Sequence, residues 1–431
     1  MKKRVFIVMY NFPPIGIGRG VAWNYFADEL ARNGYSVEVV TTDPSMNDPY
    51  YNNAKIKEIK KTFKLTRLKD AKFYYKIYGG KPAQKSSDTK QNKRIVKSVI
   101  VKGYKNLSRL LFYPDRMRFW SKKAKKYLET KDIGKNDIII SVGFPFSTHL
   151  EMCKLKKKFG CKLILDYGDP WSFNPSVETE PVWRKGIDHF IESRIINKAD
   201  LIIVTTNSTK EQFIKKFGIK NVEVVRLGVD LSVYKKYSLG DFKNDKLTLV
   251  YTGTFYKEIR DPSNFFDAIT KTDKRIDYPV RMIFAGKKDV FVEELIKKYE
   301  LSSLKNIEIN FLGNIGIDEC VKMQLSADIL LFFSNKTGIQ VPGKIYEYLA
   351  TGKPVLCISY ERAEAETILD ENKCAIIINN SEDMVDSISL VLNEFKKDGK
   401  IAKLSLSKNY NYDWSNVSKN ILKCVEEVDR K

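Results

Sequence analysis

The stretch GKIYEYLATGKPVL, residues 343–356, decides the fold of the second half of this chain. Its first part has helical spacing from Lys344 onward, and Gly352 ends that helix because glycine adopts the left-handed conformation without steric cost. The apolar run 355–358 then follows as a strand. This pattern puts Glu347 on the same helix face as Lys344, just before a tight turn. A carboxylate accepts hydrogen bonds from ribose hydroxyls and a helix N-terminus attracts phosphate, so the stretch predicts a nucleotide site.

Strand and helix signals alternate along most of the remaining chain, which implies parallel sheets joined by crossover helices. In the first half, apolar runs predict strands at 4–10, 36–42, 137–143, 161–167, 199–206 and 222–230. In the second half, they predict strands at 247–253, 280–286, 307–313, 327–333, 353–359 and 375–379. Three strands of the second series end in glycine, where a chain turns over the carboxyl edge of a sheet. Ligands of open α/β sheets bind at that edge, so we expect the site there.

The length of 431 residues suits two domains of ordinary size. A polar stretch rich in lysine, residues 234–246, marks the boundary between them. We therefore expect an N-terminal domain over 1–235, a C-terminal domain over 245–410 and a final helical segment over 411–431.

Most of the positive charge lies in one segment, residues 55–127, which interrupts the strand and helix pattern. It holds 24 lysines and arginines but four acids, whereas the net charge of the whole chain is +22. Aromatic and aliphatic side chains alternate with the basic ones, as in FYYKIY at 73–78. Such a mixture favours an anionic membrane surface over nucleic acid, and a merely solubilising basic surface is the alternative. We expect peripheral contact with the inner face of the plasma membrane.

Several protein classes are disfavoured by composition. The sequence contains no run of 18 apolar residues, so we expect no transmembrane helix. The N-terminus has the pattern of a first strand, not of a signal peptide. The six cysteines are scattered without a C-x-x-C pair, which is typical of free thiols in a reducing cytoplasm. Only two histidines, His149 and His189, are present and no D-x-D motif occurs. We therefore expect a cytoplasmic protein that requires no metal and no cofactor.

The string 343–356 resembles the nucleotide-sugar motif of family 4 (GT4) glycosyltransferases, which are retaining enzymes of the GT-B fold. The resemblance covers nearly the whole chain and is weakest at 55–110. It implies an α/β protein with two Rossmann-like domains that face each other across a cleft, and a C-terminal helix that packs back on the first domain. It also implies that Glu347, with Lys344 nearby, binds a nucleotide-sugar donor. A solvent-facing helix residue is the alternative for Glu347.

The loop NFPPIGIGRG at 11–20 follows the first strand and resembles the glycine-rich loop of the family. Glycine lets backbone N–H groups approach an anion closely, and Arg19 adds positive charge. The resemblance implies that Gly18 and Arg19 contact the donor diphosphate or the acceptor. An ordinary turn is the alternative for this loop.

The loop YTGTFYKEIRDP at 251–262 is the corresponding loop of the second domain. The family commonly has G-R followed by a lysine a few residues later. In this chain Thr254 occupies the position of that arginine, and Arg260 occupies the position of that lysine. The resemblance implies that Gly253 and Arg260 contact the donor diphosphate, since a guanidinium suits bidentate phosphate binding. The alternative for Arg260 is a surface ion pair with Asp261 or Glu258, and Lys257 is the reserve candidate.

The string DYGDPWSFNP at 166–175 resembles the D-x-R-D-P-W string of one GT4 branch, often from surface-polysaccharide pathways, with Gly168 in place of the arginine. It implies that Asp169 accepts a hydrogen bond from the acceptor hydroxyl; a turn aspartate is the alternative. His149, near the start of a predicted helix, is the second candidate catalytic residue. Trp171 either stacks on a sugar or packs in the core.

The E-x7-E pattern of the family is incomplete, because Ile339 stands eight residues before Glu347. This leaves the donor sugar open, together with the base, the linkage and the acceptor. The expected function is transfer of a hexose-type sugar with retention to a glycan or lipid-linked acceptor, in cell-surface polysaccharide synthesis. A GT-B-fold sugar-nucleotide epimerase and a non-catalytic membrane or nucleic-acid binding protein are the alternatives.

Overall fold

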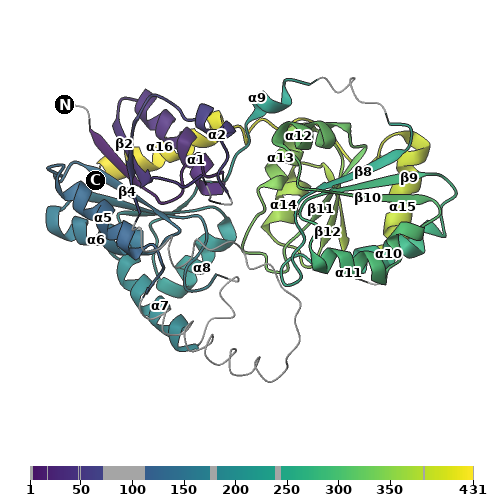
Figure 1. Cartoon of the computed structure of the whole chain (residues 1–431), viewed down its shortest axis with the longest axis horizontal. Coiled ribbons are helices and arrows are strands. Elements are labelled where there is room, and N and C mark those ends of the chain that lie inside the picture. Colours follow the sequence, from purple (N-terminus) through teal and green to yellow (C-terminus); the bar gives the residue numbers. More distant parts are fainter. Residues whose placement is uncertain are drawn as a thin grey trace. The chain divides into compact units, whose positions relative to one another are not determined.

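The computed structural model of the chain describes residues 3–16, 18–46, 48, 50–70, 112–174, 182–237, 244–381 and 384–430. The chain divides into two compact units, each drawn in Figure 1. Unit 1 comprises Met1–Thr205, Thr209–Arg226 and Ser418–Lys431, and unit 2 comprises Thr206–Ser208 and Leu227–Val417. Each unit is built on one parallel sheet with helices, so the predicted class of two Rossmann-like α/β domains is confirmed.

The sheet of unit 1 has seven parallel strands among the described residues, in the order β3-β2-β1-β4-β5-β6-β7. The strands are β1 Arg4–Val8, β2 Ser36–Thr42, β3 Lys64–Leu68, β4 Ile138–Gly143, β5 Lys162–Tyr167, β6 Leu201–Val204 and β7 Val222–Val224. In the register of the central strands, Ile7 lies between Val39 and Ile140. The strand order reverses between β1 and β4, and open α/β sheets bind ligands beyond the carboxyl ends of two such strands.

Helices accompany this sheet along the chain (Figure 1): α1 Gly18–Arg32, α2 Ala54–Lys57, α5 Arg118–Glu129, α6 Ser147–Phe159, α7 Val182–Ile196 and α8 Asn207–Phe217. One core of unit 1 joins Val8 of β1 and Leu163 of β5 to Leu155 of α6. The last helix, α16 Trp414–Arg430, groups with unit 1 from Ser418 onward. Near its end, Asp429 accepts a hydrogen bond from Lys3 Nζ at 2.6 Å, which ties the C-terminal helix to the start of the chain.

The sheet of unit 2 has six parallel strands among the described residues, in the order β10-β9-β8-β11-β12-β13. The strands are β8 Leu247–Thr252, β9 Val280–Ala285, β10 Ile307–Gly313, β11 Ile329–Phe333, β12 Val355–Ser359 and β13 Ala375–Asn379. Successive side chains of β8 enter different cores, because Leu249 belongs to one cluster and Val250 to the other. The strand order reverses between β8 and β11, which marks the ligand-binding point of this sheet.

The helices of unit 2 are α9 Leu231–Tyr234, α10 Ser263–Asp273, α11 Val290–Lys298, the 3-10 helix η3 Leu301–Ser303, α12 Ile317–Ser326, α13 Lys344–Thr351, α14 Glu364–Glu371 and α15 Met384–Asp398. The stretch 343–356 folds as its sequence predicts: α13 ends at Gly352, which has φ +70°, and β12 follows. Buried Ile345 and Leu349 of α13 pack in one core with Phe332 of β11.

The basic segment 55–127 departs from the sequence prediction because its described parts contain regular elements: α2 and most of α5 lie in it, as does one strand. Residues 64–68 form β3, an edge strand that pairs with β2, where the sequence pattern indicated an interruption. The strand was missed because Lys64 and Arg67 break its apolar pattern, and charged side chains are what protect an exposed sheet edge. Residues 71–111 of the segment, including the loop expected at 79–93, lie outside the described residues.

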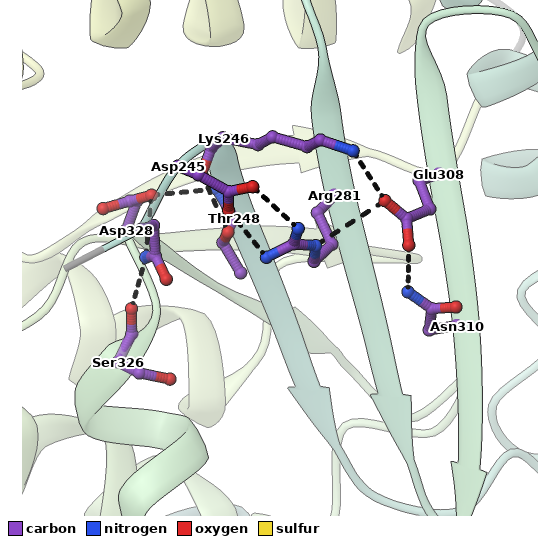
Figure 2. A network of polar contacts seen from close by, with 9 residues as sticks. Asp245, Lys246, Thr248, Arg281, Glu308, Asn310, Ser326 and Asp328 are labelled. Carbon is purple, nitrogen blue, oxygen red and sulfur yellow. Dashed lines mark hydrogen bonds and ion pairs between the residues drawn. The ribbon is translucent and has the colours of Figure 1, made fainter. Parts of the chain in front are cut away.

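The amino edge of the second sheet carries a set of paired charges, which Figure 2 shows pointing toward one another. Arg281 of β9 contacts Asp245 at 3.0 Å and Glu308 of β10 at 3.7 Å. Lys246 contacts the same Glu308 at 2.9 Å. Hydrogen bonds from Asn310 and Lys246 lower the pKa of Glu308 to about 2. Opposite charges on neighbouring strands stabilise their pairing, so this cluster links the starts of three strands.

Two further sequence predictions concern the cysteines, expected as free thiols, and the expected lack of a transmembrane helix. All six cysteines are free, and five of them are buried. Burial raises the pKa of Cys153 to about 12, so this thiol is protonated and behaves as a small apolar group. Among the helices of the described ranges, none is both long enough and apolar enough to span a membrane.

Candidate functional site

Arg260 lies in the loop that follows β8, at the carboxyl edge of the second sheet, and its side chain reaches the loop that follows β11. Its Nη2 donates to Asn335 Oδ1 at 2.8 Å, and its Nη1 donates to Tyr251 Oη at 3.3 Å and to the Thr254 carbonyl at 3.4 Å. Every one of these partners is neutral. Within the described residues, the buried Nε of Arg260 has no hydrogen-bond partner. The guanidinium therefore lies next to the carboxyl ends of β8 and β11, where the strand order reverses. None of these partners gives it a counter-charge.

The alternative that the sequence offered for Arg260, a surface ion pair, is not formed within the described part of the chain. Asp261 instead accepts hydrogen bonds from the backbone and side chain of Ser263, at 2.9 and 2.5 Å, and so stabilises the start of α10. The positive charge of Arg260 is thus left for an anion. A guanidinium can bind a phosphate group through two parallel hydrogen bonds, so contact of Arg260 with a diphosphate stays a prediction.

Lys344 and Glu347 lie together on α13, as the helical spacing predicts. Lys344 Nζ donates to Glu347 Oε2 at 2.9 Å, and the two side chains are 34% and 32% exposed, so a ligand can reach both. Burial alone would lower the pKa of Lys344, but the negative charge of Glu347, which also accepts a hydrogen bond from Lys344, outweighs it and the pKa is raised. Lys344 therefore stays cationic beside an ionisable carboxylate that can accept hydrogen bonds from hydroxyl groups.

A buried amide on α12 holds this carboxylate in place. Gln324 is fully buried, and its Nε2 donates to Glu347 Oε2 at 2.9 Å and to Thr252 Oγ1 at 2.9 Å. Its Oε1 accepts a hydrogen bond from Tyr234 at 2.7 Å. Glu347 is thereby connected to the carboxyl end of β8, next to Tyr251, which contacts Arg260. Sequence reasoning missed Gln324 because a single glutamine outside any motif gives no local signal.

The backbone at this edge is crowded in a way that only glycine permits. A Cβ on Gly286 would lie 1.9 Å from the carbonyl oxygen of Gly253, and a Cβ on Gly253 would lie 2.6 Å from Tyr251 Oη. The chains that leave β8 and β9 therefore approach each other closely. Gly253, a predicted donor-binding residue, thus lies beside the Arg260 contacts and leaves the backbone there uncovered by a side chain.

In unit 1, Arg19 is already engaged by an acid. Its Nε donates to Asp166 Oδ2 at 2.7 Å, its Nη2 donates to Asp166 Oδ1, and Trp23 Nε1 donates to the same carboxylate at 2.6 Å. Asp166 is fully buried, so the ion pair fixes α1 to β5. The structure thus gives Arg19 a structural partner, and its contact with the donor stays a prediction.

The glycine-rich loop at 11–20, like Arg19, is engaged in contacts within unit 1. Gly18 is the first residue of α1, so the predicted loop ends earlier than its last glycine. The N–H of Gly16 donates to the Tyr50 carbonyl at 2.9 Å and is not available to an anion. A Cβ on Gly20 would lie 2.6 Å from the carbonyl oxygen of Asn11, so this glycine is needed for close approach of α1 to the loop. Donor binding by Gly18 stays a prediction.

Two of the acceptor-side residues have clear environments. Asp169 is exposed directly after β5, at the carboxyl edge of the first sheet, and its contact with an acceptor stays a prediction. Trp171 is 4% exposed and its ring stacks on Phe146 with centroids 5.1 Å apart. Of the two alternatives for Trp171, the structure therefore favours packing in the core.

His149 is fully buried near the start of α6. Its Nδ1 lies 2.8 Å from Ser141 Oγ, and its ring lies 4.7 Å from that of Tyr167. Burial lowers the pKa of His149 to about 3, so the imidazole is neutral at physiological pH. This environment favours a packing role over the catalytic role that the sequence suggested. In the described ranges, no group of three or more His, Cys, Asp or Glu side chains is arranged to hold a metal ion.

Family models match both halves of the chain. The model described as Glycosyltransferase Family 4 matches residues 18–233, which is about half of the chain. The chain belongs to this family. The model described as Glycosyl transferases group 1 matches residues 246–394, and it covers Gly253, Arg260, Lys344 and Glu347. The chain is thus a glycosyltransferase, and the predicted enzyme class is confirmed at this level.

Solved structures share the fold of this glycosyltransferase. The sucrose-phosphate synthase of Thermosynechococcus elongatus superimposes with a TM-score of 0.64 at 13% identity, with 99% of each chain covered. Anabaena HepE in complex with UDP-glucose has a TM-score of 0.60 at 11% identity, with 98% of this chain and 99% of that chain covered. TarM has a TM-score of 0.61 at 12% identity, with 100% and 99% covered. A comparison with curated proteins gives no match.

Proposed function

We propose that this glycosyltransferase moves a hexose-type sugar, with retention, from a nucleoside diphosphate donor to a glycan or lipid-linked acceptor. The observation that carries the proposal is the guanidinium of Arg260, which meets only neutral partners at the carboxyl edge of the second sheet. Lys344 and Glu347 lie on the same edge, connected through Gln324 to the end of β8. A cation for phosphate and a carboxylate for ribose together suit a nucleotide sugar.

The residues would divide the work of transfer as follows. Arg260 and Lys344 stabilise the negative charge that develops on the diphosphate while the bond from the sugar to the phosphate oxygen breaks. Glu347 accepts hydrogen bonds from the ribose, and Gln324 orients its carboxylate. The acceptor hydroxyl forms its new bond on the face that the diphosphate leaves, and a phosphate oxygen takes the hydroxyl proton. No metal is required for these steps, and Asp169 helps to orient the acceptor.

The place of the reaction is proposed from charge and from the resemblance of the 166–175 string. The basic segment 55–127 favours an anionic membrane surface at the cytoplasmic side, where lipid-linked acceptors are found. The branch whose D-x-R-D-P-W string this chain resembles often serves surface-polysaccharide pathways. HepE was solved with UDP-glucose, which supports a nucleotide-sugar donor for a chain of this fold. We therefore propose a peripheral membrane enzyme of cell-surface polysaccharide synthesis.

The proposal is tested by titrating the full-length protein with UDP, GDP, ADP, CDP and dTDP in a calorimeter, with and without EDTA. We expect one or two of these to bind in the micromolar range, with EDTA making no difference. The matching nucleotide sugars are then incubated with membrane lipid extract, and the anomeric configuration of the product is read by NMR. We expect release of the nucleoside diphosphate to depend on the acceptor, and the anomeric configuration to be retained.

Other outcomes would contradict the proposal in distinct ways. Failure of every nucleoside diphosphate to bind would remove the donor site. Conversion of the sugar nucleotide without any acceptor would indicate an epimerase, and an inverted product would contradict retention. Loss of activity in EDTA that Mg²⁺ restores would contradict metal-independent transfer.

A further inference from the structure

Helix α7 of unit 1 exposes its apolar residues and buries its acids. Trp183, Ile187 and Phe190 are spaced four and three residues apart, so they share one face, and they are 44%, 42% and 55% exposed. On the other face, Asp188 is 7% exposed and Glu192 is fully buried. An ordinary surface helix does the reverse, with its apolar stripe on the core. This reversal needs a physical reason.

Contacts inside unit 1 fix the rotation of α7. Arg184 Nε donates to Asp188 Oδ2 at 3.3 Å, and the backbone N–H of Ser172 donates to Glu192 Oε2 at 2.9 Å. Ile195 and Ile196 pack in the core of the unit next to these acids. Turning the apolar face inward would break these contacts and expose the two isoleucines. The outward position of Trp183 and Phe190 is therefore a stable property of the fold.

The exposed face of α7 is also basic. The guanidinium of Arg194 lies over the ring of Phe190, 4.2 Å from its centroid, and Lys198 is exposed just beyond the helix end. His189 stacks on Phe217 of α8 at 4.8 Å, so α8 is a neighbour and adds exposed Lys215 and Lys216 against one exposed acid, Glu211. The two acids of α7 itself are buried, and the apolar face is flanked by cations at the helix end and on the neighbouring α8.

The N-terminal end of α7 contacts the basic segment of the chain. Arg184 donates to the Pro114 carbonyl at 2.5 Å, and its guanidinium lies 5.0 Å from the ring centroid of Tyr113. The start of α7 therefore lies beside the described C-terminal part of segment 55–127. From there α5 begins, with Phe119 47% exposed and Lys122 Nζ 6.0 Å from the centroid of its ring.

We propose that the face of α7 formed by Trp183, Ile187, Phe190 and Arg194 docks on an anionic membrane surface. Aromatic and aliphatic side chains enter the boundary between headgroups and acyl chains, and the flanking cations bind lipid phosphates. A second copy of the chain suits this face less well, since a symmetric contact would bring equal positive charges together. The inference deepens the membrane part of the proposed function, and its test requires neither donor nor acceptor.

The test is flotation of the full-length protein with vesicles of phosphatidylcholine, with or without phosphatidylglycerol. The variant Trp183→Ser/Ile187→Ser/Phe190→Ser is compared with the control Val290→Ser/Ile317→Ser/Leu390→Ser, whose residues in unit 2 are 67%, 48% and 69% exposed. We expect the wild type and the control to bind phosphatidylglycerol vesicles. We expect the α7 variant to bind them at least about tenfold more weakly than the wild type, because it loses the apolar contribution to binding.

Salt separates the apolar and the charged contributions. Raised salt weakens the attraction of the basic residues, so the ratio between the wild type and the α7 variant is expected to persist. An α7 variant that binds as tightly as the wild type would overturn the inference. A drop in melting temperature beyond that of the control would show that residues of the same chain cover this face, and a loss of self-association would show a second copy; both would overturn it.

The membrane test and the donor test fail separately. A wild type that binds neither kind of vesicle would remove the membrane contact of both α7 and segment 55–127. The nucleotide titration would still decide whether the donor site exists.

Discussion

The two edges of the second sheet treat charge in opposite ways. At the amino edge, Arg281 and Lys246 are paired with Asp245 and Glu308, and the four charges balance (Figure 2). At the carboxyl edge, Arg260 contacts a hydroxyl, an amide and a carbonyl, and none of these neutralises it. A partly buried cation without a counter-charge costs free energy in the unliganded protein. The comparison supports the proposal that Arg260 at the carboxyl edge binds an anionic ligand, whereas the paired charges of the amino edge stabilise the strand pairing.

The same criterion separates two arginines that the sequence treated alike. Arg19 and Arg260 each follow the first strand of a Rossmann-like unit; the family resemblance implies contact with the donor diphosphate or the acceptor for Arg19, and with the diphosphate for Arg260. Arg19 is paired with buried Asp166, whereas the contacts of Arg260 are neutral. For these two arginines, the availability of the charge, and not the place in a glycine-bearing loop, makes Arg260 the stronger candidate ligand residue.

The largest expected effect at the carboxyl edge is that of Glu347→Gln. The amide keeps the shape of the side chain but loses the charged acceptor for ribose hydroxyls, so kcat/KM is expected to fall about a hundredfold. Gln324 stays buried beside it, so the melting temperature should change by no more than about 2 °C. Calorimetry with the preferred nucleotide and its 2′-deoxy analogue provides the second readout. The wild type should prefer the ribose form, and the variant should lose most of this preference.

A different outcome for Glu347→Gln would indicate that Glu347 is a structural residue, like the paired charges of the amino edge. If the melting temperature collapses while the preference for ribose survives, Glu347 is structural and the ribose is held elsewhere. The variant Glu308→Gln is the matched control, because the same chemical change at the amino edge should leave both nucleotide affinities unchanged.

Much of this arrangement follows from sequence, and the rest depends on distant contacts. Apart from β3, the strands of both sheets are predicted by apolar runs, and the proximity of Lys344 and Glu347 follows from helical spacing. The pairing of Arg19 with Asp166 spans 147 residues, and no local pattern contains it. The orientation of Glu347 by Gln324 and the burial of His149 depend likewise on tertiary packing. β3 escaped prediction because its cations disrupt the apolar alternation on which strand prediction rests.

The smallest expected effect is the pH dependence of the amino edge. The pKa of Glu308 is lowered to about 2 in the folded state, because Asn310 and Lys246 favour its charged form. Its contribution to stability is therefore present above the ordinary pKa of a glutamate and is lost as the pH falls toward 2. Since the side chain is about half exposed, we expect Glu308→Gln to lower the melting temperature by about 1 °C at pH 7. Differential scanning calorimetry between pH 7 and pH 3 should show this difference shrinking.

An unchanged difference across that pH range would show that the Glu308 carboxylate does not stabilise the edge. A difference of many degrees at pH 7 would also contradict the account, since it assigns to these exposed pairs only a modest share of the stability.

The most direct measurement compares two arginines of the same sheet, one at each edge. Arg260→Met and Arg281→Met remove equal charges, and both proteins are titrated in a calorimeter with the nucleoside diphosphate that the wild type binds. The account predicts that Arg260→Met weakens binding by roughly tenfold to a hundredfold, the usual value of a charge-assisted hydrogen bond, while Arg281→Met leaves the affinity unchanged. Equal affinities for both variants, or a loss confined to Arg281→Met, would contradict it.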